Sequence, residues 1–208
     1  MNDIYKTKDA WLKDAKVNKQ QYEKMYKESI SNNENFWSEQ ILYKLLVTIA
    51  DKKIPTLLDA GALRLVTNKA FSKMKLHDQM VLTPHPGEAA DMLKVSIQEI
   101  QKDRIESAKK LQKKYNCVIV LKGQGTIICN KKEMYLCSSG GPELAVAGTG
   151  DILSGVIGSL IAQGLTPLDA AITGVGLHAQ AGENFATKVG TIGLAASELI
   201  PQIRKLLN

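Results

Sequence analysis

The sequence predicts an α/β fold in which helices flank a mainly parallel sheet, and three observations support this prediction. From about residue 41 onward, short apolar segments rich in Val, Ile and Leu alternate with longer segments of helical periodicity. Alternation of this kind is typical of a parallel sheet covered by helices. Polar or glycine-containing segments follow several of the predicted strands, and the carboxyl ends of strands are where ligands bind in such sheets.

Each predicted element is an apolar or amphipathic segment bounded by polar or turn-forming residues. The predicted strands cover residues 54–59, 79–83, 117–123, 125–130 and 133–137. The predicted helices cover residues 41–53, 88–93, 96–115, 150–164, 167–188 and 194–207. Only the polar pair Lys131-Lys132 separates the last two strands, so we expect them to form a hairpin.

The first 40 residues differ in composition from the rest of the chain. They contain no Gly and no Pro, yet they hold six of the eleven aromatic residues. Their seven lysines balance seven acidic residues, so the net charge of +6 belongs to the remainder. Such a segment is too short to bury a core of its own. We therefore predict a helical or partly extended arm at 1–40, with its most helical part at 18–30, and a separate domain at 41–208.

Composition also argues against several classes of protein. No apolar run approaches the roughly 20 residues of a membrane span, and the first residues lack the apolar core of a secretory signal, so we expect a cytoplasmic protein without membrane contact. The lysines are scattered and form no basic stripe with aromatic residues, so no nucleic acid is expected as a partner. Cys117, Cys129 and Cys137 show no C-x-x-C spacing, which favours reduced thiols over a disulfide or zinc site.

The glycine-rich turn at 148–150 precedes a strongly apolar helix that carries a carboxylate, Asp151, in its first turn. We expect this helix to be buried, with Gly155 and Gly158 leaving one side thin enough for close packing. The start of a buried helix leaves N–H groups unpaired and partially positive, which makes it a candidate anion site. Asp151 is either an ordinary helix-start carboxylate or a general base held beside a phosphate. The residue pattern leaves both interpretations open.

Three further polar residues follow predicted strands. His85 is either a hydrogen-bonded loop histidine or a ligand contact at a strand end. Glu88 is interpreted as the carboxylate that begins a helix, where its charge is favourable to the helix dipole. Lys122 is either an ordinary strand-end lysine or, beside Gly123 and Gly125, a group that contacts the phosphates of a nucleotide.

Three motifs together resemble the ADP-dependent NAD(P)H-hydrate dehydratase family, which has the ribokinase-like fold. They are L-T-P-H-P-G-E at 82–88, L-K-G-x-G-T at 121–126 and A-G-T-G-D-x-L-S-G at 147–155. Residues 59–63 and 193–197 are similar to the family's D-A-D-A-L and its closing G-L-x-A-S. Gly61 replaces the second Asp of the former, and Val146 stands where Thr is usual. The resemblance runs from about residue 41 to the end.

The resemblance implies a role for each matched residue. It assigns His85 and Asp151 to the substrate, hydrated NADH or NADPH, with Asp151 as the catalytic base. It implies ADP or ATP as co-substrate and Mg²⁺ as the metal, with Glu88 organising the ion through water. It assigns to the adenine nucleotide the residues Lys122, Gly123, Gln124, Gly125, Thr126 and Gly150. A homo-oligomer and a functional link to an NAD(P)H-hydrate epimerase are expected on the same ground.

The family's early strands, with their G-x-x-x-Y-T-G-A and G-P-G-L-G patterns, have no counterpart in the sequence. We therefore expect a sheet that lacks its N-terminal strands. Residues 1–40 instead resemble the N-terminal segment of acetyl-CoA synthetases, around the F-W-x-E pattern at 36–39. Two alternatives to an active dehydratase stay open: a small-molecule kinase of the same superfamily, similar to hydroxymethylpyrimidine kinase, and a non-catalytic remnant that still binds nucleotide.

Overall fold

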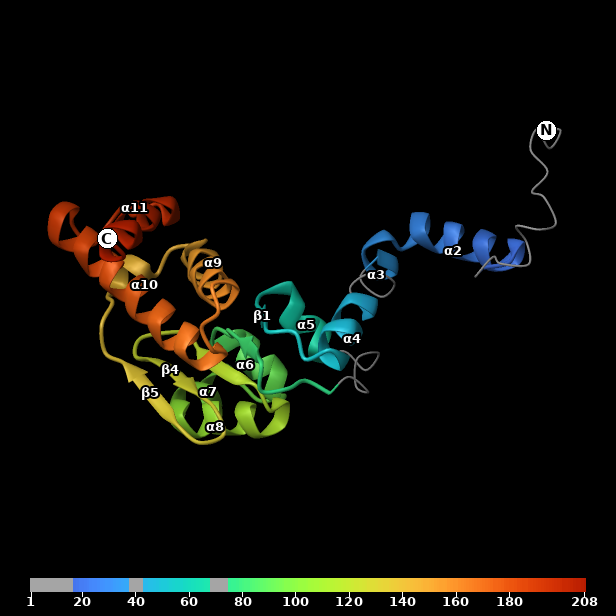
Figure 1. Ribbon diagram of the computed structural model, residues 1–208, viewed down its shortest axis with the longest axis horizontal. Coiled ribbons are helices and arrows are strands. Elements are labelled where there is room, and N and C mark those ends of the chain that lie inside the picture. Colours follow the sequence, from blue (N-terminus) through green and yellow to red (C-terminus); the bar gives the residue numbers. More distant parts are fainter. Residues whose placement is uncertain (1–16, 38–42, 68–74) are drawn as a thin grey trace. The chain divides into compact units, whose positions relative to one another are not determined.

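The computed structural model describes residues 17–37, 43–67 and 75–208, and the chain divides into two units, Met1–Leu46 and Val47–Asn208 (Figure 1). In the first unit, helix α2 (Lys19–Ser31) is followed by α3 (Asn33–Trp37). The side chain of Asn18 accepts from the Gln21 N–H and the Gln21 side chain accepts from the Asn18 N–H. This capping box fixes the start of α2, and α2 agrees with the helix predicted at 18–30. The expected domain boundary near residue 40 remains a prediction.

The second unit is built on a five-stranded sheet with the strand order β1-β2-β3-β4-β5. Three parallel strands come first, β1 (Thr56–Leu58), β2 (Met80–Leu82) and β3 (Val118–Leu121). The hairpin of β4 (Thr126–Cys129) and β5 (Met134–Cys137) then adds two antiparallel strands, as expected. Every residue of β2 and β3 is buried, which is the pattern of strands covered on both faces.

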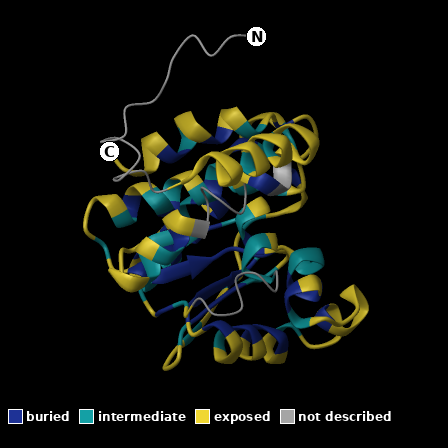
Figure 2. Ribbon diagram, turned by 90° about the vertical axis from the view of Figure 1, so that its right-hand side faces the viewer, coloured by how far each residue is buried: buried dark blue, intermediate teal, exposed yellow. Residues whose placement is uncertain are grey.

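Helices cover both faces of this sheet, so that the dark-blue strands in Figure 2 lie between two helical layers. One layer contains α6 (Pro86–Leu93), α7 (Ile97–Lys102) and α8 (Arg104–Tyr115). The other contains α9 (Thr149–Ala162), α10 (Pro167–Val189) and α11 (Leu199–Leu206). The core on the α9 side joins Val81, Val118 and Val120 of the sheet to Leu153 and Ile157 of α9.

Shorter elements complete the unit and lead into the larger ones. Helix α4 (Tyr43–Asp51) precedes β1, and α5 (Gly61–Thr67) follows it. Two single 3₁₀ turns, η3 (Pro142–Leu144) and η4 (Ala196–Glu198), come before α9 and α11. Within the described residues, β1 has a strand on one side only and is therefore an open edge of the sheet. Among all the residues that the structure describes, no helix is both long and apolar enough to cross a membrane.

Two of the predicted helices differ in detail from the observed ones. The segment 96–115 forms two helices, because Asp103 leaves the helical conformation (φ −147°) and caps α8 by accepting from the Glu106 N–H. The segment 194–207 begins with the 3₁₀ turn η4, and its α-helix starts only at Leu199. The first difference arises from a capping residue, Asp103, which interrupts the helix without changing its apolar periodicity.

The expectation that α9 is buried is wrong for one of its faces. Leu153, Ile157 and Leu160 point into the core, but Asp151 and Gly155 are exposed. A Cβ on Gly155 or Gly158 would meet nothing within 4 Å, so these glycines do not permit the packing. The close approach instead depends on Gly174 of α10, where a Cβ would lie 2.6 Å from Ile157 Cγ1.

Candidate functional site

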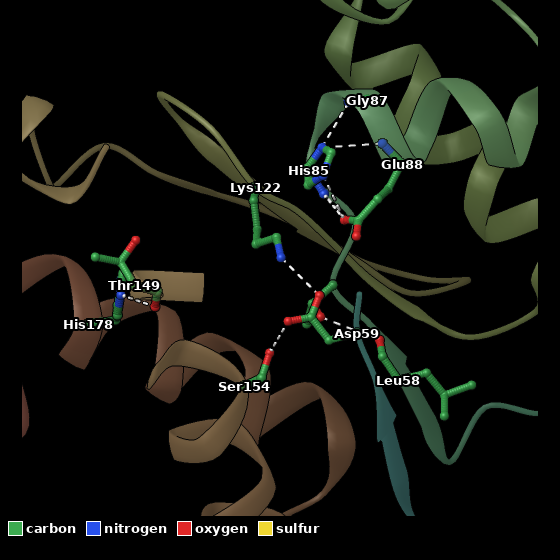
Figure 3. A network of polar contacts seen from close by, with 10 residues as sticks. Leu58, Asp59, His85, Gly87, Glu88, Lys122, Thr149, Ser154 and His178 are labelled. Carbon is green, nitrogen blue, oxygen red and sulfur yellow. Dashed lines mark hydrogen bonds and ion pairs between the residues drawn. The ribbon is translucent and has the colours of Figure 1, made fainter. Parts of the chain in front are cut away.

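Side chains from three elements meet at the carboxyl end of the parallel strands (Figure 3). Lys122 follows β3, and its Nζ lies 2.9 Å from Oδ1 of Asp59, the residue after β1. Ser154 of α9 donates from Oγ to the other oxygen, Asp59 Oδ2, at 2.6 Å. Since both oxygens of Asp59 have a partner, this carboxylate ties α9 and β3 to the end of β1.

The electrostatics of Asp59 show that it is held as a carboxylate. Partial burial by itself raises the pKa of Asp59, but the hydrogen bond from Ser154 and the hydrogen bond and charge of Lys122 outweigh it. The pKa of Asp59 is therefore lowered from its ordinary value of 3.8. The ion pair in turn holds the Lys122 ammonium near the start of α9, where a Cβ on Gly150 would lie 3.3 Å from Nζ.

Helix α9 begins without a side-chain cap. Gly148 occupies the N-cap position with φ +90°, a conformation that favours glycine. Within the described residues, the N–H groups of Gly150 and Asp151 have no hydrogen-bond partner. These N–H groups, the helix dipole and the nearby Lys122 together make a site suited to an anion.

Two buried residues fix the turn before α9. The Thr149 hydroxyl contacts the carbonyl oxygens of Leu144 and Val146, both at 2.8 Å. His178 of α10 donates from Nε2 to the Thr149 carbonyl oxygen at 2.9 Å. Burial lowers the pKa of His178 below its ordinary 6.5, and the positive charge of Lys122 adds to this, although the Thr149 carbonyl acts in the opposite direction. A neutral imidazole therefore supports the turn.

Asp151 presents its carboxylate to solvent in the first turn of α9. Among the described residues its side chain has no hydrogen-bond or ion-pair partner, so it is not a capping group. Asp151 belongs to a helix that was expected to be buried, yet the residue is exposed at the start of α9, beside the candidate anion site. It is free to accept a proton from a bound molecule.

His85 and Glu88 form a capping box at the start of α6. His85 Nδ1 accepts from the N–H groups of Gly87 and Glu88, at 3.0 and 3.2 Å. Glu88 Oε2 in turn accepts from the His85 N–H at 2.9 Å. Because Nδ1 is an acceptor, the neutral ring carries its proton on Nε2. With 56% of its side chain exposed, His85 still has a face for a ligand.

Within the described residues, three consecutive backbone donors of the loop after β3 have no hydrogen-bond partner. Gly123 and Gly125 have φ values of +135° and +67°, and the Thr126 hydroxyl closes the turn by donating to the Gly123 carbonyl oxygen. In the described part of the chain, the N–H groups of Gly123, Gln124 and Gly125 have no partner. Consecutive free N–H groups of this kind suit phosphate oxygens.

The described residues around this site offer few protein ligands to a metal ion. No group of three or more His, Cys, Asp or Glu side chains in the described residues could hold one. Mg²⁺ needs no such cage, since it commonly keeps several waters and binds one or two carboxylates together with substrate phosphates. Glu88 has one oxygen engaged in the capping box, and within the described residues its other oxygen has no partner.

A hollow in the described part of the second unit lies away from these residues. It has a volume of about 450 Å³ and is lined by Val118, the first residue of β3, and by Asn130, which follows β4. It is therefore at the opposite end of β3 from Lys122. None of the predicted site residues lines it. Volume alone does not identify the functional site of this protein.

Sequence reasoning missed several residues that shape the site. Ser154 and His178 had no assigned role, although Ser154 lies within the recognised A-G-T-G-D-x-L-S-G motif. Arg104 also went unnoticed within a lysine-rich helix, yet its guanidinium donates to carbonyl oxygens of Leu121, which ends β3, and of Gly125 in the loop that follows. Contacts over such sequence separations become visible only in the folded chain.

Residues 31–205 match the model of the family described as NAD(P)H-hydrate dehydratase. The chain belongs to this family. Within the dehydratase family, the chain is 41% identical over 173 residues to the bifunctional NAD(P)H-hydrate repair enzyme Nnr of Coxiella burnetii. The aligned region covers 83% of this chain and 34% of that protein. The recognition from the three motifs is thereby confirmed.

Two solved structures support the ribokinase-like fold. The ADP/ATP-dependent NAD(P)H-hydrate dehydratase of Bacillus subtilis, co-crystallised with ATP and Mg²⁺ and soaked with CoA, is 34% identical with a TM-score of 0.65, covering 74% of this chain and 55% of that one. A ribokinase-like superfamily protein of Enterococcus faecalis is 26% identical with a TM-score of 0.70, and the match covers 82% of this chain and 58% of that one. The chain thus spans between a third and a little over half of these three proteins.

Proposed function

We propose that the chain provides the nucleotide and phosphoryl-transfer part of an ADP-dependent dehydratase that converts hydrated NADH or NADPH back to NADH or NADPH. One observation carries the proposal. Within the described residues, two sets of backbone N–H groups, at 123–125 and 150–151, have no hydrogen-bond partner. The first set follows Lys122 in the chain, and the second lies at the start of α9 with the Lys122 ammonium and the exposed Asp151 carboxylate. Anion donors and a free base in one place are what phosphoryl transfer to a hydroxyl needs.

The nucleotide would occupy the loop after β3 and the start of α9. The backbone of Gly123, Gln124 and Gly125 supplies donors, and Lys122 and Thr126 flank them. Gly150 lets a phosphate approach the helix start, because no side chain stands between the backbone and Lys122 Nζ. ADP fits this arrangement, and the Bacillus relative is described as ADP/ATP-dependent, so ATP is the second candidate.

The hydrated nicotinamide ring would lie between Asp151 and His85. Asp151 takes the proton of the ring hydroxyl as its oxygen attacks the terminal phosphoryl group of ADP, and AMP leaves. Phosphate is a better leaving group than hydroxide, and the lone pair of the ring nitrogen expels it. Loss of a proton from the neighbouring ring carbon then restores the dihydronicotinamide. The His85 Nε2–H offers a hydrogen bond to the substrate at the edge of the site.

Mg²⁺ would supply charge neutralisation at the transferred phosphoryl group. Glu88 is the residue of this chain proposed to hold one of its waters, while its other oxygen keeps the cap of α6 in place. Self-association and a functional link to an epimerase of hydrated cofactors remain predictions. The family match favours this repair reaction over the hydroxymethylpyrimidine kinase alternative.

The test is regeneration of NADH from hydrated NADH, followed by absorbance with ADP and Mg²⁺ present. Calorimetry with ADP alone tests the nucleotide site separately from the whole reaction. ADP binding with NADH formation would support the full proposal, and ADP binding without it would support only a nucleotide-binding role. Phosphorylation of a hydroxymethyl pyrimidine, with no NADH released from its hydrate, would select the kinase instead.

A further inference from the structure

Arg104, the first residue of α8, contacts the backbone of the loop after β3 at several points. Its Nη2 donates to the carbonyl oxygen of Leu121 at 3.2 Å and to that of Gly125 at 3.1 Å. Nη1 and Nη2 both reach the Lys122 carbonyl oxygen at 3.4 Å. One guanidinium thus holds three carbonyl groups of a five-residue segment. A lysine ammonium could not reproduce this, because only arginine offers a flat fork of five N–H donors.

These contacts determine which way the loop's N–H groups face. In a planar trans peptide the C=O and the following N–H point in opposite directions. The Lys122 carbonyl faces Arg104, so the Gly123 N–H faces away from it. The Lys122 N–H, on the peptide whose carbonyl is that of Leu121, donates to the Pro84 carbonyl oxygen at 2.9 Å. Arg104 therefore fixes the orientation of donors that it does not itself touch.

Gly123 is adapted to the same contact. A Cβ there would lie 2.7 Å from Arg104 Nη1, and its φ of +135° also disfavours a side chain. The approach of the guanidinium to this loop thus requires glycine at this position.

The position of Arg104 in the first turn of α8 is electrostatically unfavourable, and its contacts with the loop compensate for this. A cation in the first turn of a helix opposes the helix dipole, and partial burial lowers the pKa of the Arg104 guanidinium. Asp103 caps the helix and Glu106 adds a negative charge to the same turn, which offsets part of this cost. The break between α7 and α8 at Asp103 places Arg104 beside the loop.

We propose that Arg104 is a positioning residue for the nucleotide: its fork turns the Gly123 N–H toward the phosphates of ADP and holds in place the loop that carries the N–H groups of Gln124 and Gly125. This inference rests on the proposed function for the identity of the ligand. The conformation of the loop, by contrast, depends on this chain alone.

The experiment compares the full chain with Arg104→Lys, which keeps the charge, and Arg104→Gln, which removes it. Arg204→Gln changes an exposed arginine of α11 and is the matched control. Calorimetry with ADP should show both Arg104 variants weakened about tenfold or more, the factor of one charge-assisted hydrogen bond. The control should bind ADP like the parent. Parent-like affinity in Arg104→Lys would overturn the proposal, because charge alone would then suffice.

Amide hydrogen exchange, resolved by residue, gives a readout independent of any ligand. The Lys122 amide should exchange faster in both Arg104 variants, while the amides of β3 serve as the internal reference for global unfolding. Unchanged protection of Lys122 relative to β3 would overturn the positioning role. If the parent itself fails to bind ADP, the proposed function fails for the nucleotide, and the exchange data still decide whether Arg104 orders the loop.

Discussion

Asp151 is the residue on which the proposed chemistry depends most directly. Its exposed carboxylate has no partner within the described residues, so Asp151→Asn should disturb little besides proton transfer. We expect turnover of hydrated NADH to fall about 100-fold or more, the usual scale for loss of a general base, with nearly unchanged ADP affinity. Absorbance of regenerated NADH and calorimetry measure the two quantities. Equal rates for an active parent and the variant would rule out Asp151 as the base.

Lys122 is expected to bind phosphate from the position in which Asp59 holds it. Lys122→Ala should weaken ADP binding by roughly 1.5–3 kcal/mol, the range for a hydrogen bond to a charged group. Lys113→Ala, which removes an exposed lysine of α8, is the control for a general loss of positive charge. If both variants bind ADP equally well in calorimetry, Lys122 makes no specific contact.

His178 should make the stability of the chain depend on pH. Its pKa in the fold is lowered from 6.5, so the unfolded chain binds the proton more readily. The destabilisation of the fold by His178 is absent above the pKa that this residue has in the unfolded chain. It grows as the pH falls from about 6.5 toward the lower pKa of His178 in the folded chain. Asp59 acts only in a more acidic range, since its stabilisation is lost as the pH falls below 3.8 through its lowered pKa.

The measurement is thermal unfolding of the parent and of His178→Gln, whose amide can still donate to the Thr149 carbonyl. Between about pH 7.5 and about pH 5, the midpoint should fall more steeply for the parent than for the variant. Parallel curves would show that His178 does not titrate differently in the folded and unfolded chain.

At the scale of elements, the contact between α9 and α10 depends on one glycine. Gly174→Ala would place a methyl group 2.6 Å from Ile157 Cγ1, so we expect a loss of about 1–3 kcal/mol through overpacking. Gly176→Ala on the same helix meets nothing within 4 Å and should be neutral or stabilising by up to about 1 kcal/mol, because alanine favours the helix. Chemical denaturation compares them; equal stabilities would contradict the packing role.

The sequence was sufficient to predict most of these elements, because each has an apolar period that is visible locally. Strand-end placement likewise led to the prediction of a site at Lys122 and the loop after it, and the structure places Lys122 directly after β3. The sequence did not reveal that Gly174, rather than Gly155, allows the helices to approach, since that depends on which face of each helix meets the other. The exposure of Asp151 and the contacts of Arg104 were missed for the same reason. Each of these features depends on contacts between two elements, so the sequence of one segment alone does not show it.

For the whole molecule, the open edge of β1 has the largest consequence. Within the described residues nothing pairs with the far side of this strand, and unpaired edges promote association between sheets. We expect the 208-residue chain alone to be marginally stable, to self-associate through β1 and to have little dehydratase activity. A monomeric, cooperatively folded and fully active chain would contradict this expectation.

Leu57 allows the edge itself to be tested. Thr56 donates its N–H to the Gln79 carbonyl on the β2 side, and the Leu58 carbonyl accepts from Thr83 on that same side. Because successive residues of a strand alternate, the N–H of Leu57 faces the open edge. Leu57→Pro removes this donor without interrupting the ladder to β2, and Leu57→Ala is the control that shortens the side chain but keeps the N–H. Sedimentation should show weaker self-association for the proline variant than for the alanine variant. Equal association of the two would mean that the chains meet through a surface other than β1.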